Sequence, residues 1–139
     1  MFLLDTNVVS EPKRSRPDAG VLTWLGEQLQ SSLYISVLTV GELRRGIVRL
    51  APGRRRDDLD FWLGDLILQH GERILPIDMD VTERWAALAE ANRAAGRASD
   101  MTDELIAATA QAHGLTVVTR NIRHFEPSGC RVLSPWSQP

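Results

Sequence analysis

Three acidic side chains occupy comparable places in the sequence. Asp5 follows the short apolar run 2–4, Glu42 falls in the helical segment after a second apolar run, and Asp103 opens the segment DELIAATA. Carboxylates that converge repel one another unless a proton or a cation neutralises them. Oxygen ligands of this kind select Mg²⁺ or Mn²⁺, which can activate water and stabilise charge on a phosphoryl group. If the fold brings the three acids together, they predict metal-assisted phosphoryl chemistry.

Each of these acids also has a purely local explanation. Asp5 can accept hydrogen bonds within its own turn, and Glu42 can pair with Arg45 one turn further along its helix. Asp103 can simply favour the positive end of a helix. The metal-site hypothesis therefore depends on whether all three acids reach the same edge of one sheet.

Alternating strand and helix patterns predict the elements that position these acids. Strands separated by helices of ten or more residues pair in parallel, and the helices cover both faces of the sheet. In such sheets ligands bind beyond the carboxyl ends of the strands, where Asp5 lies. The predicted strands are 2–4, 33–38, 74–77 and 115–119, with 131–133 as a candidate fifth; the predicted helices are one capped by Asp18 and reaching Leu29, one ending at Pro52–Gly53, 57–69, one capped by Asp80 with Glu83 and reaching Ala95, and one from Asp100 or Thr102 to His113.

The bulk properties predict one soluble cytoplasmic α/β domain over residues 1–139. That length suits a single domain, and no repeat or linker divides it. No stretch approaches the ~18 apolar residues of a membrane helix, so we expect no membrane contact. The single cysteine, Cys130, excludes an internal disulfide, and the net charge of −2 does not by itself indicate a nucleic-acid binder.

Four segments carry a resemblance to a known family. They are LLDTNVVSE (3–11), SVLTVGELRRG (36–46), DELIAATAQAHGLTVVTRNIRHF (103–125) and SPW (134–136). In order and spacing they resemble the PIN-domain ribonucleases, and most closely the VapC/FitB-type toxins of bacterial toxin–antitoxin pairs. The resemblance implies an α/β/α sandwich with a central parallel sheet of four or five strands, ordered 3-2-1-4-5. It also implies metal-dependent cleavage of RNA, in many members of transfer RNA.

The resemblance assigns roles to individual residues. Asp5, Glu42 and Asp103 match the family's three main acids. Thr6 and Thr119 match hydroxyl positions beside the first acid and the last strand, with Asn7 and Asn121 as further pocket residues. The family's fourth acid stands at one of two places that here hold Asn121 and His124. We therefore expect one metal ion, Mg²⁺ or Mn²⁺, held mainly by Asp5 and Asp103. Glu42 would act directly or through water, and Asp100 is either a further ligand or a helix cap.

Two kinds of partner follow from the family besides RNA. A small cognate antitoxin is expected to cover the acidic pocket with its C-terminal segment. A homodimer is expected, with apolar residues around Trp24 and Trp62 at its interface. Arginines near the acids are candidates for binding RNA phosphates, although a solvated surface would explain them equally well; they are Arg44, Arg45, Arg49, Arg54, Arg120 and Arg123.

Two other functions are compatible with parts of the sequence. The segment ILPIDMDVT (74–82) resembles the nucleophile motif of haloacid-dehalogenase-type phosphatases, with Asp78 as nucleophile and Asp80 as acid. The chain ends too soon after Thr82 for that fold, and its only lysine, Lys13, lies upstream of the motif. The stronger alternative is a catalytically weak or inactive PIN module that binds an antitoxin and regulates its own operon.

Overall fold

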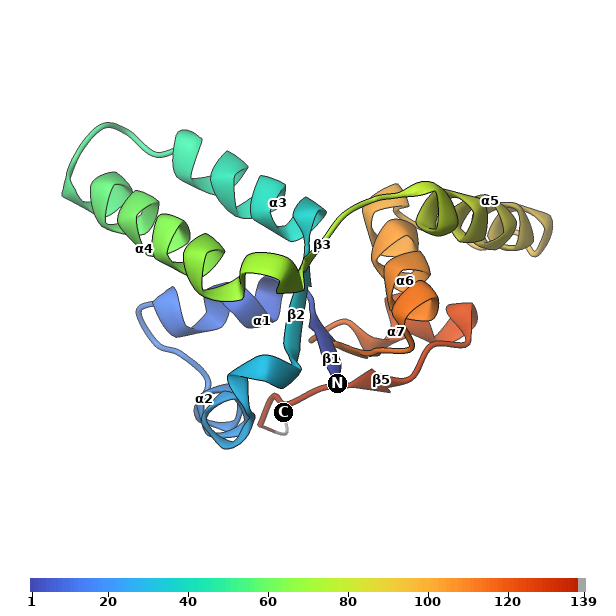
Figure 1. The fold of residues 1–139 in the computed structure, drawn as a ribbon, viewed down its shortest axis with the longest axis horizontal. Coiled ribbons are helices and arrows are strands. Elements are labelled where there is room, and N and C mark those ends of the chain that lie inside the picture. The colour runs from blue at the N-terminus through green and yellow to red at the C-terminus, as the bar shows by residue number, and fades with distance from the viewer. Residues whose placement is uncertain (138–139) are drawn as a thin grey trace.

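A five-stranded parallel sheet forms the centre of the computed structural model, which describes residues 1–137 (Figure 1). The strands lie in the order β3-β2-β1-β4-β5, which confirms the expected order and adds the fifth strand. The last two residues of the predicted 1–139 domain lie outside the described part. The strands are β1 (Phe2–Leu4), β2 (Leu33–Ser36), β3 (Ile74–Leu75), β4 (Thr116–Val118) and β5 (Val132–Leu133).

Helices connect the strands and cover both faces of the sheet. In Figure 1, α1 to α4 lie on one side and α5 to α7 on the other. The α-helices are α1 (Thr6–Ser10), α2 (Ala19–Glu27), α3 (Val37–Val48), α4 (Arg54–His70), α5 (Met79–Ala94), α6 (Met101–His113) and α7 (Ile122–Phe125); short 3₁₀ turns are η1 (Glu11–Lys13), η2 (Gln30–Ser32), η3 (Gly71–Arg73) and η4 (Glu126–Ser128).

Alternation along the strands creates two hydrophobic cores. Leu4 of β1 belongs to the core under α1 to α4, whereas its neighbour Leu3 belongs to the core under α6 and α7. Successive strand side chains point to opposite faces, so both residues are buried, and this is why β1 reads as a continuous apolar run. Trp24 and Trp62 are partly buried and pack against the first core. Their tryptophan rings therefore contribute to the core of the single chain, and their predicted place at a dimer interface stays a prediction.

Several predicted boundaries were wrong. Strand β2 ends at Ser36 rather than residue 38, because the Ser36 hydroxyl accepts a hydrogen bond from the Leu38 N–H and begins α3. Strand β3 stops at Leu75, two residues early, and β4 lacks both predicted end residues. Helix α4 begins at Arg54 instead of residue 57. The cap of α5 is Asp78, which accepts from the Val81 N–H, and not Asp80.

Other predicted ends are confirmed. The Asp18 carboxylate accepts from the Val21 N–H at the start of α2. Helix α6 ends at Gly114, whose left-handed φ of 65° suits a residue without a Cβ atom. Helices α1 and α7 were not predicted. No helix among residues 1–137 is long and apolar enough to cross a membrane.

Successive strands are added first on one side of β1 and then on the other. From β1 it proceeds outward to β2 and β3, then returns to place β4 and β5 on the other side of β1. Phe2 pairs with Leu33 on one side and with Thr116 on the other. The crevice at the carboxyl ends of β1 and β4 is therefore the topological switch point, where open α/β sheets bind ligands.

Candidate active site

Asp5 leaves β1 at this switch point. The residue is 7% exposed, and its backbone N–H donates to the Val118 carbonyl of β4. One carboxylate oxygen accepts from the Thr6 N–H at 2.8 Å and thereby caps α1. The other oxygen accepts from the Thr119 hydroxyl at 2.8 Å. The local turn contact predicted for Asp5 thus exists, but the residue that follows the neighbouring strand β4 also binds the same carboxylate.

Glu42 reaches the same edge from α3. The Ser36 cap starts that helix at Val37 and places Glu42 in its second turn. The Thr6 hydroxyl donates to Glu42 Oε1 at 2.7 Å. Thr6 follows Asp5 directly. The segment that carries the first predicted acid therefore also contacts the second, Glu42.

Asp103 approaches from the opposite face, on α6. Asp100 caps that helix by accepting from the Thr102 N–H at 2.7 Å, as the capping alternative predicted. Burial, followed by the negative charge of Asp5, raises the pKa of Asp103 above its ordinary value. The structure therefore brings the Asp103 carboxylate within electrostatic range of Asp5, although no described hydrogen bond joins the two.

The predicted pocket residues link β1 to the end of β4. The fully buried Thr119 hydroxyl accepts from the Asn121 N–H at 3.0 Å while it donates to Asp5. Asn7 Nδ2 lies 3.4 Å from Asp5 Oδ2, and Asn7 Oδ1 accepts from the Arg120 N–H. Asn121 thus contributes its backbone to the site. These contacts hold the Asp5 carboxylate in one orientation.

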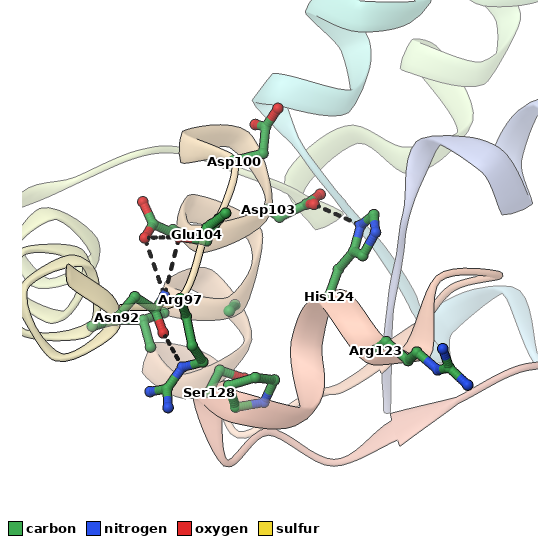
Figure 2. Close-up of a pocket in the computed structure, with 13 residues that line it drawn as sticks. Asn92, Arg97, Asp100, Asp103, Glu104, Arg123, His124 and Ser128 are labelled. Atoms are coloured by element: carbon green, nitrogen blue, oxygen red, sulfur yellow. Dashed lines mark hydrogen bonds and ion pairs between the residues drawn. The ribbon is translucent and has the colours of Figure 1, made fainter. Parts of the chain in front are cut away.

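His124 is the site residue whose contact the sequence did not indicate. Its Nδ1 lies 3.0 Å from Asp103 Oδ2, and Figure 2 shows the two side chains pointing toward one another between α6 and α7. The sequence indicated only that His124 stands at one of the two places where the family has its fourth acid. The pairing joins positions 21 residues apart, so no local pattern could have indicated it.

The donor set suits a hard divalent cation. Asp103 is partly buried and faces the charge of Asp5, and a bound cation would relieve that repulsion. Among residues 1–137, no three His, Cys, Asp or Glu side chains gather closely enough to hold an ion by themselves. Water would have to supply the remaining coordination positions, as it commonly does for Mg²⁺. The sharing of one ion by all three acids stays a prediction.

Two hollows border this acidic edge. One of about 160 Å³ lies beside α6 and is lined by Asp103, His124, Arg97 and Arg123, among others (Figure 2). The other, of about 340 Å³, is bordered by Thr6 and Glu42 and is lined mainly by apolar side chains of α3 and α4, with the basic Lys13, Arg14 and Arg55 also in its wall. The acids therefore stand between a polar hollow and an apolar one.

The predicted arginines differ in what their side chains contact. Arg44 forms an ion pair with Asp60 of α4, and the Arg120 guanidinium lies 5.6 Å from the centre of the Trp136 ring. Arg123 borders the polar hollow beside Asp103. Arg45, Arg49 and Arg54 are exposed. Of the six candidates, Arg123 is thus the one that the structure brings to a hollow lined by a predicted acid.

Comparisons with known proteins agree with this architecture. A sequence model of the PIN domain matches residues 2–127. The plasmid stability protein StbB of Pseudomonas syringae pv. tomato is 45% identical over 98% of this chain and 99% of its own. The VapC ribonuclease Y4jK of Sinorhizobium fredii is 39% identical over 98% of both chains.

The third relative is also represented by a solved structure. Toxin FitB of Neisseria gonorrhoeae is 39% identical over 98% of this chain and 99% of its own. A chain in the crystal structure of FitAcB from the same organism superposes with a TM-score of 0.94 at 37% identity, covering 99% of this chain and all of that one. With its sheet order, its acidic edge and these similarities, the chain belongs to the PIN-domain family, in the group that contains VapC and FitB.

Proposed function

We propose that this protein is a Mg²⁺- or Mn²⁺-dependent endoribonuclease and the toxin of a type II toxin–antitoxin pair. The observation that carries the proposal is the pair Asp5 and Asp103, which β1 and α6 bring to one sheet edge, where burial and then the charge of Asp5 raise the pKa of Asp103. Acids kept in mutual repulsion are characteristic of functional sites. The names of two relatives, a VapC ribonuclease and a toxin, support the same function.

Asp5 and Asp103 would hold the cation, with Glu42 binding it directly or through water. When bound, such an ion supplies a Lewis acid that steadies charge on the scissile phosphate and lowers the pKa of water. The Thr119 hydroxyl fixes the orientation of Asp5, and the Thr6 hydroxyl fixes that of Glu42. These two hydroxyls let the carboxylates receive a cation with little rearrangement.

RNA would approach across the polar hollow. Arg123 borders it beside Asp103, and its guanidinium suits a backbone phosphate. Arg45, Arg49 and Arg54 are exposed and extend the set of candidate phosphate contacts, whereas Arg44 would first have to release Asp60. Transfer RNA is the first substrate to test.

A cognate antitoxin and a second copy of the chain complete the proposed assembly. The apolar hollow beside Glu42 suits an antitoxin segment that covers the acids. Large apolar side chains are exposed just after α2 and on α4, including Leu29 at 75%, Phe61 at 80% and Leu68 at 82%. Exposed apolar residues of this size favour a homodimer over an isolated chain. The cytoplasm, where the single cysteine stays reduced, is the proposed location.

One experiment tests the catalytic function. Purified protein is incubated with total RNA and with transfer RNA in Mg²⁺, in Mn²⁺ or in EDTA, beside an Asp5→Ala variant. Cleavage that needs the cation and disappears in the variant is the expected result. Cleavage that persists equally in Asp5→Ala would place the activity elsewhere. No cleavage in any metal would favour the alternative of an inactive antitoxin-binding regulator, which the neutral Asn121 and the histidine at position 124 make worth testing.

A further inference from the structure

The imidazole of His124 faces the carboxylate that the proposed cation would use. His124 Nδ1 lies 3.0 Å from Asp103 Oδ2, and the two residues come from different helices. Adjacent ligands of an octahedral ion bound at about 2.1 Å lie about 3.0 Å from one another. The separation therefore suits both a hydrogen bond and a pair of neighbouring metal ligands.

The position of His124 is tied to that of Asp5. The His124 N–H donates to the Asn121 carbonyl at 3.0 Å, and the Asn121 N–H donates to the Thr119 hydroxyl. That hydroxyl in turn donates to Asp5. On the other side, the neighbouring Phe125 is fully buried and anchors α7 in the core. The turn that orients one acid thus also sets the histidine against the other.

We propose that His124 is a nitrogen ligand of the cation bound by Asp103, and that it gives the site a preference for Mn²⁺ over Mg²⁺. The inference rests on the cation of the proposed function. To bind the ion, the imidazole would present the lone pair of Nδ1 and keep its hydrogen on Nε2. Mg²⁺ strongly prefers oxygen ligands, whereas imidazole binds later first-row metals well and Mn²⁺ accepts both kinds of donor.

The test measures metal binding without RNA. The full chain is loaded with MnCl₂, and electron spin-echo envelope modulation detects a ¹⁴N nucleus bound to the ion. Calorimetric titrations then give the affinities for Mn²⁺ and Mg²⁺. The variants are His124→Asp, which supplies a carboxylate in place of the imidazole, and His124→Ala. His113→Ala is the matched control, since His113 is exposed at the far end of α6. Circular dichroism verifies that each variant is folded.

The parent and the His113→Ala control should show the ¹⁴N modulation, and both His124 variants should lack it. In His124→Asp, the ratio of Mn²⁺ to Mg²⁺ affinity should fall about tenfold. A parent without ¹⁴N modulation, without Mn²⁺ binding or with an unchanged ratio in His124→Asp would overturn the inference. RNA cleavage separates the two proposals: cleavage without a nitrogen ligand leaves only the proposed function standing, and a nitrogen ligand without cleavage leaves only this inference.

Discussion

Two neighbouring carboxylates of α6 differ sharply in their surroundings. Burial by itself would raise the pKa of Glu104, but hydrogen bonds from Ser99 and Asn92 outweigh it and hold the pKa below its ordinary value. Burial also raises the pKa of Asp103, one residue earlier, and there the negative charge of Asp5 raises it further. Figure 2 shows the two side chains leaving α6 in different directions.

The difference separates a structural acid, Glu104, from Asp103, the acid to which the proposed function gives a role. Glu104 has its donors already, so the network with Asn92 and Ser99 ties the end of α5 and the loop after it to α6. Asp103 has His124 as its hydrogen-bond partner and otherwise faces other acids. A carboxylate left in such a state gains from binding a cation, which is the general reason that perturbed groups gather at functional sites.

The largest expected effect is on cleavage. Asp103→Asn should lower the rate of RNA cleavage by at least about a hundredfold, because it removes a charge that holds the cation. Glu104→Gln, at a temperature where it is folded, should keep a rate close to the parent's. Both are measured with the same RNA in excess Mn²⁺. Equal losses in the two variants would contradict the division of roles between these neighbours.

The next largest effect is on stability, and here we expect Glu104 rather than Asp103 to be the sensitive residue. Glu104→Ala should lower the free energy of unfolding by about 2 kcal/mol, since it removes the carboxylate that accepts from both the buried Asn92 amide and the Ser99 hydroxyl. Asp103→Ala should leave that free energy equal or higher, because it relieves repulsion with Asp5. Urea titration of both variants is the measurement. A destabilised Asp103→Ala protein would show that Asp103 is structural too.

A smaller effect is expected at Thr119. Thr119→Val keeps the shape of a fully buried side chain but removes the hydroxyl that donates to Asp5, so the free energy of unfolding should fall by about 1 kcal/mol. Asp5 would then lose the buried hydroxyl donor that follows β4. Thr119→Ser retains the hydroxyl and is the control in urea titrations. Loss of the same size in both variants would assign the effect to packing.

The smallest effect concerns pH. The raised pKa of Asp103 means that its protonated form is favoured by the fold, so this contribution to stability is present in acid and is lost as pH rises through the folded pKa. The lowered pKa of Glu104 acts in reverse: its contribution is present above the unfolded pKa and is lost as pH falls through the folded value.

Substituting each acid in turn should therefore reveal how its contribution to the free energy of unfolding depends on pH. The gain in stability of Asp103→Asn over the parent should be larger at neutral pH than near the ordinary carboxyl pKa, where the parent is partly protonated. The loss of stability in Glu104→Gln, relative to the parent, should be smaller near the ordinary carboxyl pKa than at neutral pH. Urea titrations at several pH values measure both differences. Parallel curves for the two variants would contradict the opposite shifts.

Local patterns and a family resemblance were enough to predict the strand order and to place Asp5, Glu42 and Asp103 near one edge. Helix and strand periods identify elements whose faces are buried, and parallel pairing then fixes which ends meet. The cap of α5 was misassigned because Asp78 and Asp80 both suit that role, and the point where the chain leaves β3 decides between them. The contacts of His124 and Glu104 escaped prediction because they join separate elements.

The position of β1 also orders events during synthesis. This strand is made first, yet it lies in the middle of the sheet, and its pairing with β4 cannot form until residues 116–118 exist. Thr119, which orients Asp5, comes later still. The acidic edge therefore stays incomplete until late in synthesis, and an unfinished polypeptide that stops before β4 carries Asp5 without the Thr119 hydroxyl that orients it.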